Sequence, residues 1–184
     1  MKRVLFSVIF LISVFAKAHG QQDLPKNKFK LFSRAEISYL FGINDVYDAQ
    51  KVNSLHVKFV IGSANQITGF GIGLENSSYR AANGDGLSFE TLNFSANAHI
   101  LAKPVATAEI NYFIKAATGY APRIFRNYSK GFNYEVSPGI LFTTKRKSKY
   151  FLQAIYQYQE IENFFLADGQ PKIKAIGLGV GTWF

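Results

Sequence analysis

The sequence contains no cysteine, one methionine and one tryptophan among its 184 residues. Without cysteine, neither a disulfide framework nor lipoprotein acylation is possible. Charged residues are also scarce: they make up 18% of the chain, against about 25% in an average soluble domain. A soluble protein with so few charges would need a large core, and the sequence has no long amphipathic helix to build one.

Aromatic residues and glycine are abundant instead. Aromatic side chains reach 16% of the chain, and 15 residues are glycine. The length suits a single domain. An all-β shell whose apolar side chains face lipid accounts for this composition directly, because such a shell needs neither a large core nor a charged outer surface.

The N-terminus has the pattern of a signal peptide. Lys2 and Arg3 are basic, and residues 4–16 form an apolar stretch. A stretch of about 13 residues is too short for a spanning helix, which needs about 20. We therefore predict export of the chain and disfavour a membrane anchor or a buried strand.

Two small-residue motifs predict where the signal peptide ends, with cleavage after Ala18 or Gly20. The predicted organisation is a signal peptide over 1–20, a polar leader over 21–30 and a barrel domain over 31–184. Removing the signal peptide lowers the formal net charge from +9 to +6, because it carries three of the basic residues. For an exported basic protein we expect anionic lipid headgroups or lipopolysaccharide as partners, and no nucleic acid.

After the leader, apolar and polar residues alternate with period 2, which predicts β-strands. In the first such segment, Ile37, Tyr39 and Phe41 alternate with the small or polar residues Glu36 and Ser38. The same pattern predicts eight strands, over residues 35–42, 55–62, 69–75, 91–100, 106–115, 134–143, 152–159 and 175–184.

Two features distinguish a membrane barrel from a soluble one. The polar face is rich in Gly, Ser, Thr, Asn and Gln, as expected of a narrow interior rather than of a face in water. Long and short connections alternate along the chain, which places the short turns and Phe184 at the same end. We predict an all-β fold, an eight-stranded antiparallel up-and-down transmembrane β-barrel. A ten-stranded barrel is an alternative if residues 117–133 contain a further hairpin. A soluble lipocalin-like carrier is a second alternative.

The last predicted strand runs from Gly177 to Phe184 and alternates glycine with larger residues up to a terminal aromatic. With this strand the chain resembles the small outer-membrane β-barrels of the OmpA/OmpX type and porin-like families. The resemblance implies a bacterial outer-membrane location and recognition of the C-terminal strand by the barrel-assembly machinery. Thr182 departs from the aliphatic or aromatic residue that such strands carry two places before the end. The implied assembly signal comprises Gly179, Val180, Thr182 and Phe184.

Six charged residues fall on the predicted inner face of the barrel. We expect Lys115 and Glu135 near the outer ends of neighbouring strands, and Glu36 close to Lys58 across the first hairpin. Structural pairing is the favoured interpretation, since buried charges need partners and an eight-stranded interior is just wide enough for side chains. A gated path through the barrel is the alternative. The predicted lumenal network is Glu36, Lys58, Glu75, Glu109, Lys115 and Glu135.

Catalytic and cofactor motifs are weak. His99 shares a face with Ser95, but an inward pair near the end of the barrel is poorly placed for a lipid substrate. The glycines repeat every second residue within strands, unlike the G-x-G-x-x-G loop of a dinucleotide site. No metal-ligand spacing is present. We predict no catalytic residue, no metal and no cofactor, and hence no enzymatic activity.

The remaining features concern the surface. Arg123, Arg126 and Lys130 are candidate contacts for lipopolysaccharide phosphates, and the basic turn 145–149 for inner-leaflet headgroups, with a plain solvated loop as the alternative in both cases. Pro138 predicts a bulge within its strand. We expect a monomer with a structural, adhesive or loop-binding role, with gated transport of small solutes or apolar molecules as the alternative. Aromatic girdles are predicted from Tyr39, Phe41, Tyr112, Tyr134, Tyr150, Tyr156 and Tyr158.

Overall fold

The computed structural model describes residues 29–46, 50–83, 88–105, 110–125, 128–146, 148–162 and 170–184. The predicted signal peptide and nearly all of the polar leader lie outside the described residues. So do two predicted site residues, Glu109 of the lumenal network and Arg126 of the lipopolysaccharide contacts. In the described part of the chain, no helix is long and apolar enough to cross a membrane.

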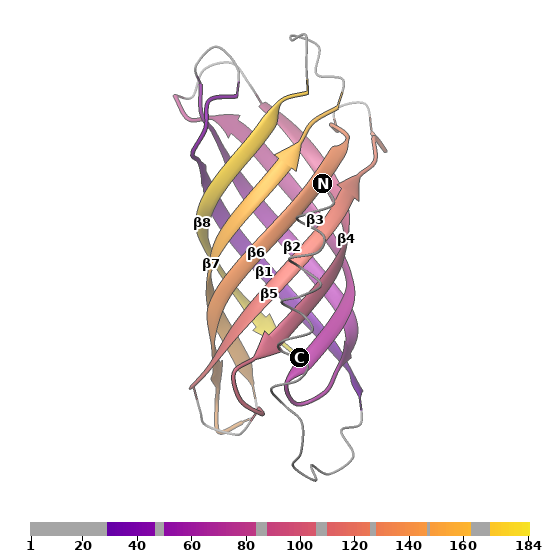
Figure 1. Cartoon of the computed structure of the whole chain (residues 1–184), viewed down its shortest axis with the longest axis vertical. Coiled ribbons are helices and arrows are strands. Elements are labelled where there is room, and N and C mark those ends of the chain that lie inside the picture. Colours follow the sequence, from indigo (N-terminus) through magenta and orange to yellow (C-terminus); the bar gives the residue numbers. More distant parts are fainter. Residues whose placement is uncertain are drawn as a thin grey trace, which may run out of the picture.

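The chain folds into a closed barrel of eight strands (Figure 1). Each strand pairs antiparallel with the next, and β1 pairs with β8 to close the barrel. The predicted fold is confirmed, and the ten-stranded alternative is wrong because eight strands suffice for closure. The strands are β1 (Lys30–Gly42), β2 (Val52–Ala64), β3 (Thr68–Ala81), β4 (Ser88–Leu101), β5 (Ile110–Ala121), β6 (Gly131–Thr143), β7 (Lys149–Glu160) and β8 (Lys172–Trp183).

The strands are longer than the sequence pattern predicts. They have 12 to 14 residues, whereas a tilted strand needs about 9–11 to cross a bilayer. β5 starts at Ile110 in the described chain and continues to Ala121, so the predicted loop 117–133 shrinks to residues 122–130. Residues 84–87 and 106–109 lie outside the described residues, so the strict alternation of long and short connections stays a prediction. Polar residues keep pairing beyond the apolar segments, and periodicity alone could not reveal this.

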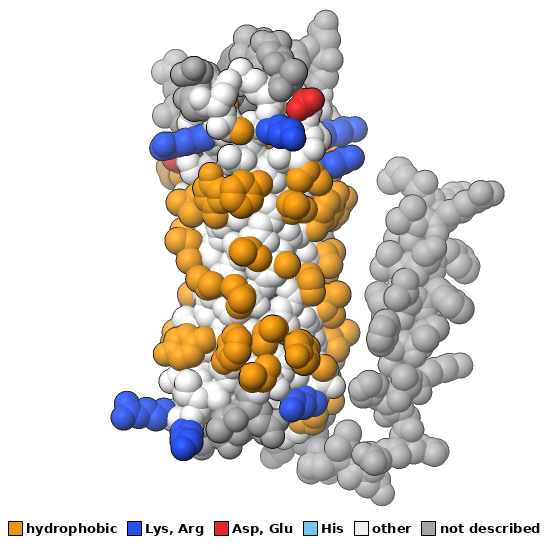
Figure 2. Space-filling model, turned by 90° about the vertical axis from the view of Figure 1, so that its left-hand side faces the viewer, with side chains coloured by type: hydrophobic (Ala, Val, Ile, Leu, Met, Phe, Trp, Pro, Cys, Tyr) orange, Lys and Arg blue, Asp and Glu red, His pale blue; other side chains and the backbone are white. Residues whose placement is uncertain are grey.

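Side chains alternate between an apolar outer surface and a polar interior, as predicted. On β3, Ile72 is 71% exposed and Glu75 only 2%. Figure 2 shows hydrophobic side chains covering the barrel between Lys and Arg residues at both ends. A soluble lipocalin-like carrier would need the opposite arrangement, so that alternative is excluded. Such an outer surface suits lipid rather than water.

Pro138 does not cause the predicted bulge. The register between β6 and β7 is the same on both sides of it, with Val136 opposite Tyr156 and Gly139 opposite Gln153. What changes is that Ser137 and Pro138 have no partner on β7 in the ladder. Proline lacks the N–H donor, so the strand loses pairing locally without gaining a residue.

The interior is layered along the barrel axis. An apolar cluster lies at each end, and most buried charges lie between the two. The rim that carries the C-terminus is called the C-terminal rim below, and the end that carries residues 43–46 and 161–162 is the opposite rim (Figure 1). The cluster near the C-terminal rim comprises Phe32, Val60, Leu101, Phe113, Leu141, Phe151 and Trp183; the cluster near the opposite rim comprises Val52, Tyr79, Phe89, Ile161 and Ile173.

Glycines on the inner face make room for this packing. A Cβ at Gly181 would overlap the Phe151 ring, and one at Gly69 would overlap the His99 ring. The strictly alternating glycines are therefore a packing feature of a crowded lumen, as the sequence analysis favoured.

Candidate functional site

The candidate site is the group of buried charges midway along the lumen. Period 2 turns these residues inward on their strands, and barrel closure brings strands from opposite sides within reach of one another. Five of the six predicted residues are described, and all five are at most 6% exposed. They form one connected set of ion pairs, but the partners differ from those expected. The five are Glu36, Lys58, Glu75, Lys115 and Glu135.

Lys115 of β5 joins two carboxylates. Its Nζ lies 2.7 Å from both carboxylate oxygens of Glu36, on β1, and 2.9 Å from Oε1 of Glu135, on β6. Lys115 lies midway along β5 rather than near its outer end, because β5 extends beyond the predicted range. The pair with Glu36 crosses the lumen, since β1 and β5 are not neighbours.

Lys58 of β2 also joins two carboxylates. Its Nζ lies 2.8 Å from Oε2 of Glu135 and 3.2 Å from Oε2 of Glu75. Glu36 is opposite Lys58 in the β1–β2 register, as expected, yet the two side chains bind different partners. The lumen is narrow enough that a partner across it is as close as one on the adjacent strand.

Arg34 is a further member that the sequence analysis missed. Its Nε lies 3.4 Å from Oε2 of Glu36, within ion-pair distance but without hydrogen-bond geometry. Its Nη2 donates to Oδ1 of Asn97 at 3.4 Å. Arg34 is 1% exposed. If the alternation of the first predicted strand is extended by one residue toward the N-terminus, Arg34 falls on the same inward face as Glu36.

The network alternates in sign and is balanced. Its order is Arg34, Glu36, Lys115, Glu135, Lys58 and Glu75, with three basic and three acidic groups. Hydroxyl and amide groups satisfy further oxygens; for example, the Ser137 hydroxyl donates to Glu135 at 2.7 Å. Charges taken out of water are tolerated only with such close partners. The arrangement neutralises the middle of the lumen.

His56 extends the network and forms a serine–histidine–glutamate constellation that the sequence analysis did not single out. Its Nε2 lies 2.7 Å from the Ser54 hydroxyl, and its Nδ1 lies 3.0 Å from Oε1 of Glu75. The Ser77 hydroxyl lies 2.7 Å from the same Nδ1 and donates to Glu75 at 2.9 Å. The signal in the sequence was Ser54-x-His56 on one strand with a glutamate on the next. All four residues are at most 2% exposed, so the constellation lies within the packed lumen.

His99 does not form the inward pair with Ser95 that was considered. Its ring packs edge-on against Trp183, with centroids 4.4 Å apart, and against Phe32 at 5.2 Å. The Ser95 hydroxyl instead accepts from Nδ2 of Asn97 at 2.9 Å. His99 therefore belongs to the apolar cluster near the C-terminal rim.

The predicted assembly signal occupies the end of β8. Gly179 faces the lumen, while Val180 and Thr182 face outward. The backbone of Phe184 exchanges two hydrogen bonds with Ser33, and its side chain is 68% exposed. Recognition by the assembly machinery stays a prediction.

Two of the three predicted lipopolysaccharide contacts, Arg123 and Lys130, lie at the opposite rim. Arg123 is exposed. Lys130 pairs with Glu162 at 3.0 Å, with about a third of each side chain exposed; this contact raises the pKa of Lys130. Lys130 therefore already has an acidic partner in the chain.

A scan against models of known protein families gives no match, and neither does a search of curated protein sequences. Among solved structures, Neisserial surface protein A (NspA) superimposes with a TM-score of 0.61 at 8% identity, over 85% of this chain and 97% of that chain. The chain has the fold of this surface barrel. The predicted resemblance to small outer-membrane barrels is thus confirmed at the level of the fold.

Two further solved structures are similar to a lesser degree. The N-terminal β-barrel domain of Pseudomonas aeruginosa OprF gives a TM-score of 0.42 at 15% identity, over 82% of this chain and 97% of that chain. The outer membrane enzyme PagL gives 0.44 at 16% identity, over 80% and 98%.

Proposed function

We propose that the protein is an integral barrel of a bacterial outer membrane, without enzymatic activity, whose lumen is closed and whose role is structural or exerted through its outer connections. The apolar outer surface and the terminal aromatic strand support the location. The observation that carries the function is the neutral ion-pair network between two apolar clusters. Such packing suits a structural plug better than a conducting pore.

The absence of enzymatic activity is supported by the burial of the Ser54–His56–Glu75 group. A catalytic serine must contact its substrate, and Ser54 is 1% exposed. The Ser54 hydroxyl bonds to Nε2 of His56 at 2.7 Å. Glu75 accepts from Ser77 at 2.9 Å and from Asn93 and Gln157 at 3.3 Å. The constellation is best explained as part of the lumenal network.

The outer connections are the proposed contact surface. If the C-terminal rim faces the periplasm, the exterior is reached by the connections 43–51, 82–87, 122–130 and 161–171. The exposed Arg123 and the aromatic side chains of Phe125 and Tyr128 belong to one of these, with the two rings 5.3 Å apart. We propose that this surface contacts lipopolysaccharide phosphates or a protein partner, and that β8 contacts the assembly machinery.

Three measurements test the proposal. The folded chain should stay with the membrane after carbonate extraction, and its gel migration should change on boiling. In planar bilayers it should show no appreciable single-channel conductance. Release by carbonate would contradict the membrane location, whereas steady conductance would contradict the closed lumen.

Gated transport of small solutes is the second candidate. It is favoured by lumenal polar atoms without a protein partner, among them both amide atoms of Gln153 and Oε1 of Gln159 on β7. Such atoms provide sites for water along one side of the lumen. If this function is correct, Lys115→Ala or Glu135→Ala should create or enlarge a measurable conductance, because each shortens a side chain in the plug.

A further inference from the structure

The outer surface carries a groove at the seam where β1 meets β8. Its volume is about 880 Å³ and its lining is almost entirely apolar. The strand registers place five residues in one row around the barrel, from β2 through β1, β8 and β7 to β6. The row is Phe59, Ala35, Thr182, Tyr150 and Phe142.

The shape of the groove follows from the sizes of these side chains. Ala35 and Thr182 are small and form the floor, while the half-exposed rings of Phe59 and Tyr150 stand on either side. The Thr182 hydroxyl donates to the backbone oxygen of Lys149 at 3.1 Å, so it presents no unpaired polar group to lipid. This accounts for the residue that departs from the usual pattern of the terminal strand: a large side chain at position 182 would fill the groove.

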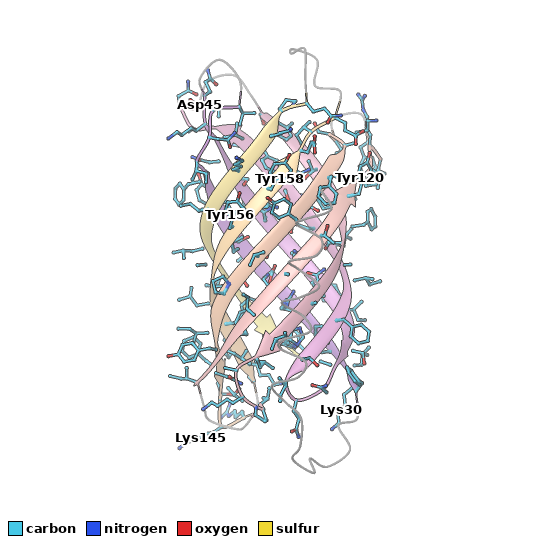
Figure 3. The ribbon with its side chains drawn as sticks, in the orientation of Figure 1. Lys30, Asp45, Tyr120, Lys145, Tyr156 and Tyr158 are labelled. Carbon is cyan, nitrogen blue, oxygen red and sulfur yellow. The ribbon has the colours of Figure 1, made fainter. Side chains whose placement is uncertain are left out.

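Positive charge lies directly beyond one end of the groove. Lys145 and Arg146 are exposed in the turn between β6 and β7, next to Tyr150 in the same hairpin. Hydrogen bonds between Thr144 and Ser148 close this turn. Neither basic residue forms an ion pair with another described residue. Figure 3 shows Lys145 and Lys30 at the same rim, away from Asp45.

The two rims differ in charge. Among the described residues, the basic side chains at the C-terminal rim are not accompanied by any exposed acidic side chain. The opposite rim mixes both signs and includes Asp45, Glu160 and Glu162. On the face drawn in Figure 2, acidic side chains likewise appear only at the opposite end. The C-terminal rim therefore attracts anions close to the membrane surface.

We propose that this groove and the adjacent turn form a binding site for one anionic phospholipid of the leaflet next to the C-terminal rim. An acyl chain lies over Ala35 and Thr182 between the aromatic walls, and the phosphate contacts Lys145 and Arg146. The site is distinct from the lumenal network and from the outer connections. It holds lipid at the seam between the first and last strands.

Native mass spectrometry of the folded, purified chain with phosphatidylglycerol or phosphatidylcholine tests the proposal. We expect one retained phosphatidylglycerol and a clear preference over phosphatidylcholine. K145Q/R146Q should reduce that preference, by about fivefold for each charge removed. The matched control K172Q/K174Q removes two exposed basic residues at the opposite rim and should leave it unchanged.

The groove is tested separately by A35L, which fills the floor. Its matched control is A98L, the same substitution on the exposed face of β4, away from the groove. A35L should abolish retention of the lipid while A98L should not, and heat-dependent gel migration shows that both variants are folded. Equal retention of the two lipids by the unmodified chain would overturn the proposal. Retention that falls in the charge variant but not in A35L would also overturn it, because such binding is general electrostatic attraction without a site. A dimer that retains no lipid would overturn it as well.

Discussion

Replacing Lys115 by methionine should destabilise the barrel by about 3 kcal/mol. Breaking a buried ion pair by removing one partner costs about 3–5 kcal/mol. The lower end applies because both carboxylates that Lys115 contacts keep another basic partner: Glu36 keeps Arg34, and Glu135 keeps Lys58. Methionine preserves most of the side-chain volume, so the loss reflects the charge rather than a cavity. The network then carries one uncompensated negative charge.

The double variant K115M/E135Q separates charge balance from mere disruption. It leaves the Arg34–Glu36 and Lys58–Glu75 pairs and restores neutrality. We expect it to recover more than about 1 kcal/mol relative to K115M, because residues in one network couple strongly. If the two substitutions acted independently, their losses of stability would add, and K115M/E135Q would be less stable than K115M.

The assay is urea unfolding of the barrel from lipid vesicles. Trp183, the only tryptophan in the chain, reports the loss of the apolar cluster near the C-terminal rim, and gel migration reports the folded fraction independently. The reasoning is refuted if K115M unfolds within about 1 kcal/mol of the unmodified chain, or if the double variant is less stable than K115M.

Other expected outcomes concern individual contacts. Phe184→Ala should lower the amount of protein assembled into outer membranes in cells while leaving refolding in vesicles unchanged, since the backbone bonds to Ser33 do not need the ring; equal loss in both assays would argue against an assembly signal. Gly181→Ala should cost about 1–3 kcal/mol by overpacking against the backbone oxygen of Ala35 and the Phe151 ring, and Phe151→Leu in the same chain should restore only the part due to the ring in urea titrations. Ser54→Ala should cost about 1 kcal/mol for its hydrogen bond, and a fluorophosphonate probe should label neither protein; labelling that depends on Ser54 would show an accessible nucleophile and contradict the proposed absence of activity.

The inner and outer faces of the strands could be predicted from the sequence because a strand reverses side-chain direction at every residue. Leu55, Val57 and Phe59 therefore had to share a face opposite to Lys58, whatever the closure of the sheet. The ends of the strands could not be predicted in this way. β5 continues through Thr118 and Gly119, where apolar alternation has stopped and only backbone pairing to β4 and β6 defines the strand.

The partners within the lumen were beyond reach for a different reason. Which charges meet across a barrel depends on the stagger of all the strands, a property of the closed sheet and not of any segment. Because their strands are neighbours, Glu36 was expected to pair with Lys58. In the closed barrel Glu36 pairs with Lys115, and Lys58 pairs with Glu135. The prediction of a bulge at Pro138 was wrong because a strand can tolerate a missing N–H donor in another way. It leaves the residue unpaired with the neighbouring strand and keeps the register.

The ion pairs that cross the lumen also bear on how the barrel folds. Glu36 and Lys115 come from β1 and β5, and Lys58 and Glu135 from β2 and β6. No hairpin contains either pair, so a half-formed sheet inside a membrane would keep only the local pairs Arg34–Glu36, Lys58–Glu75 and Lys115–Glu135. Each of the four residues would then lack its second partner, at a cost in free energy. The network therefore disfavours partially closed intermediates and couples insertion to closure. A chain with a neutral apolar lumen would lack this source of cooperativity.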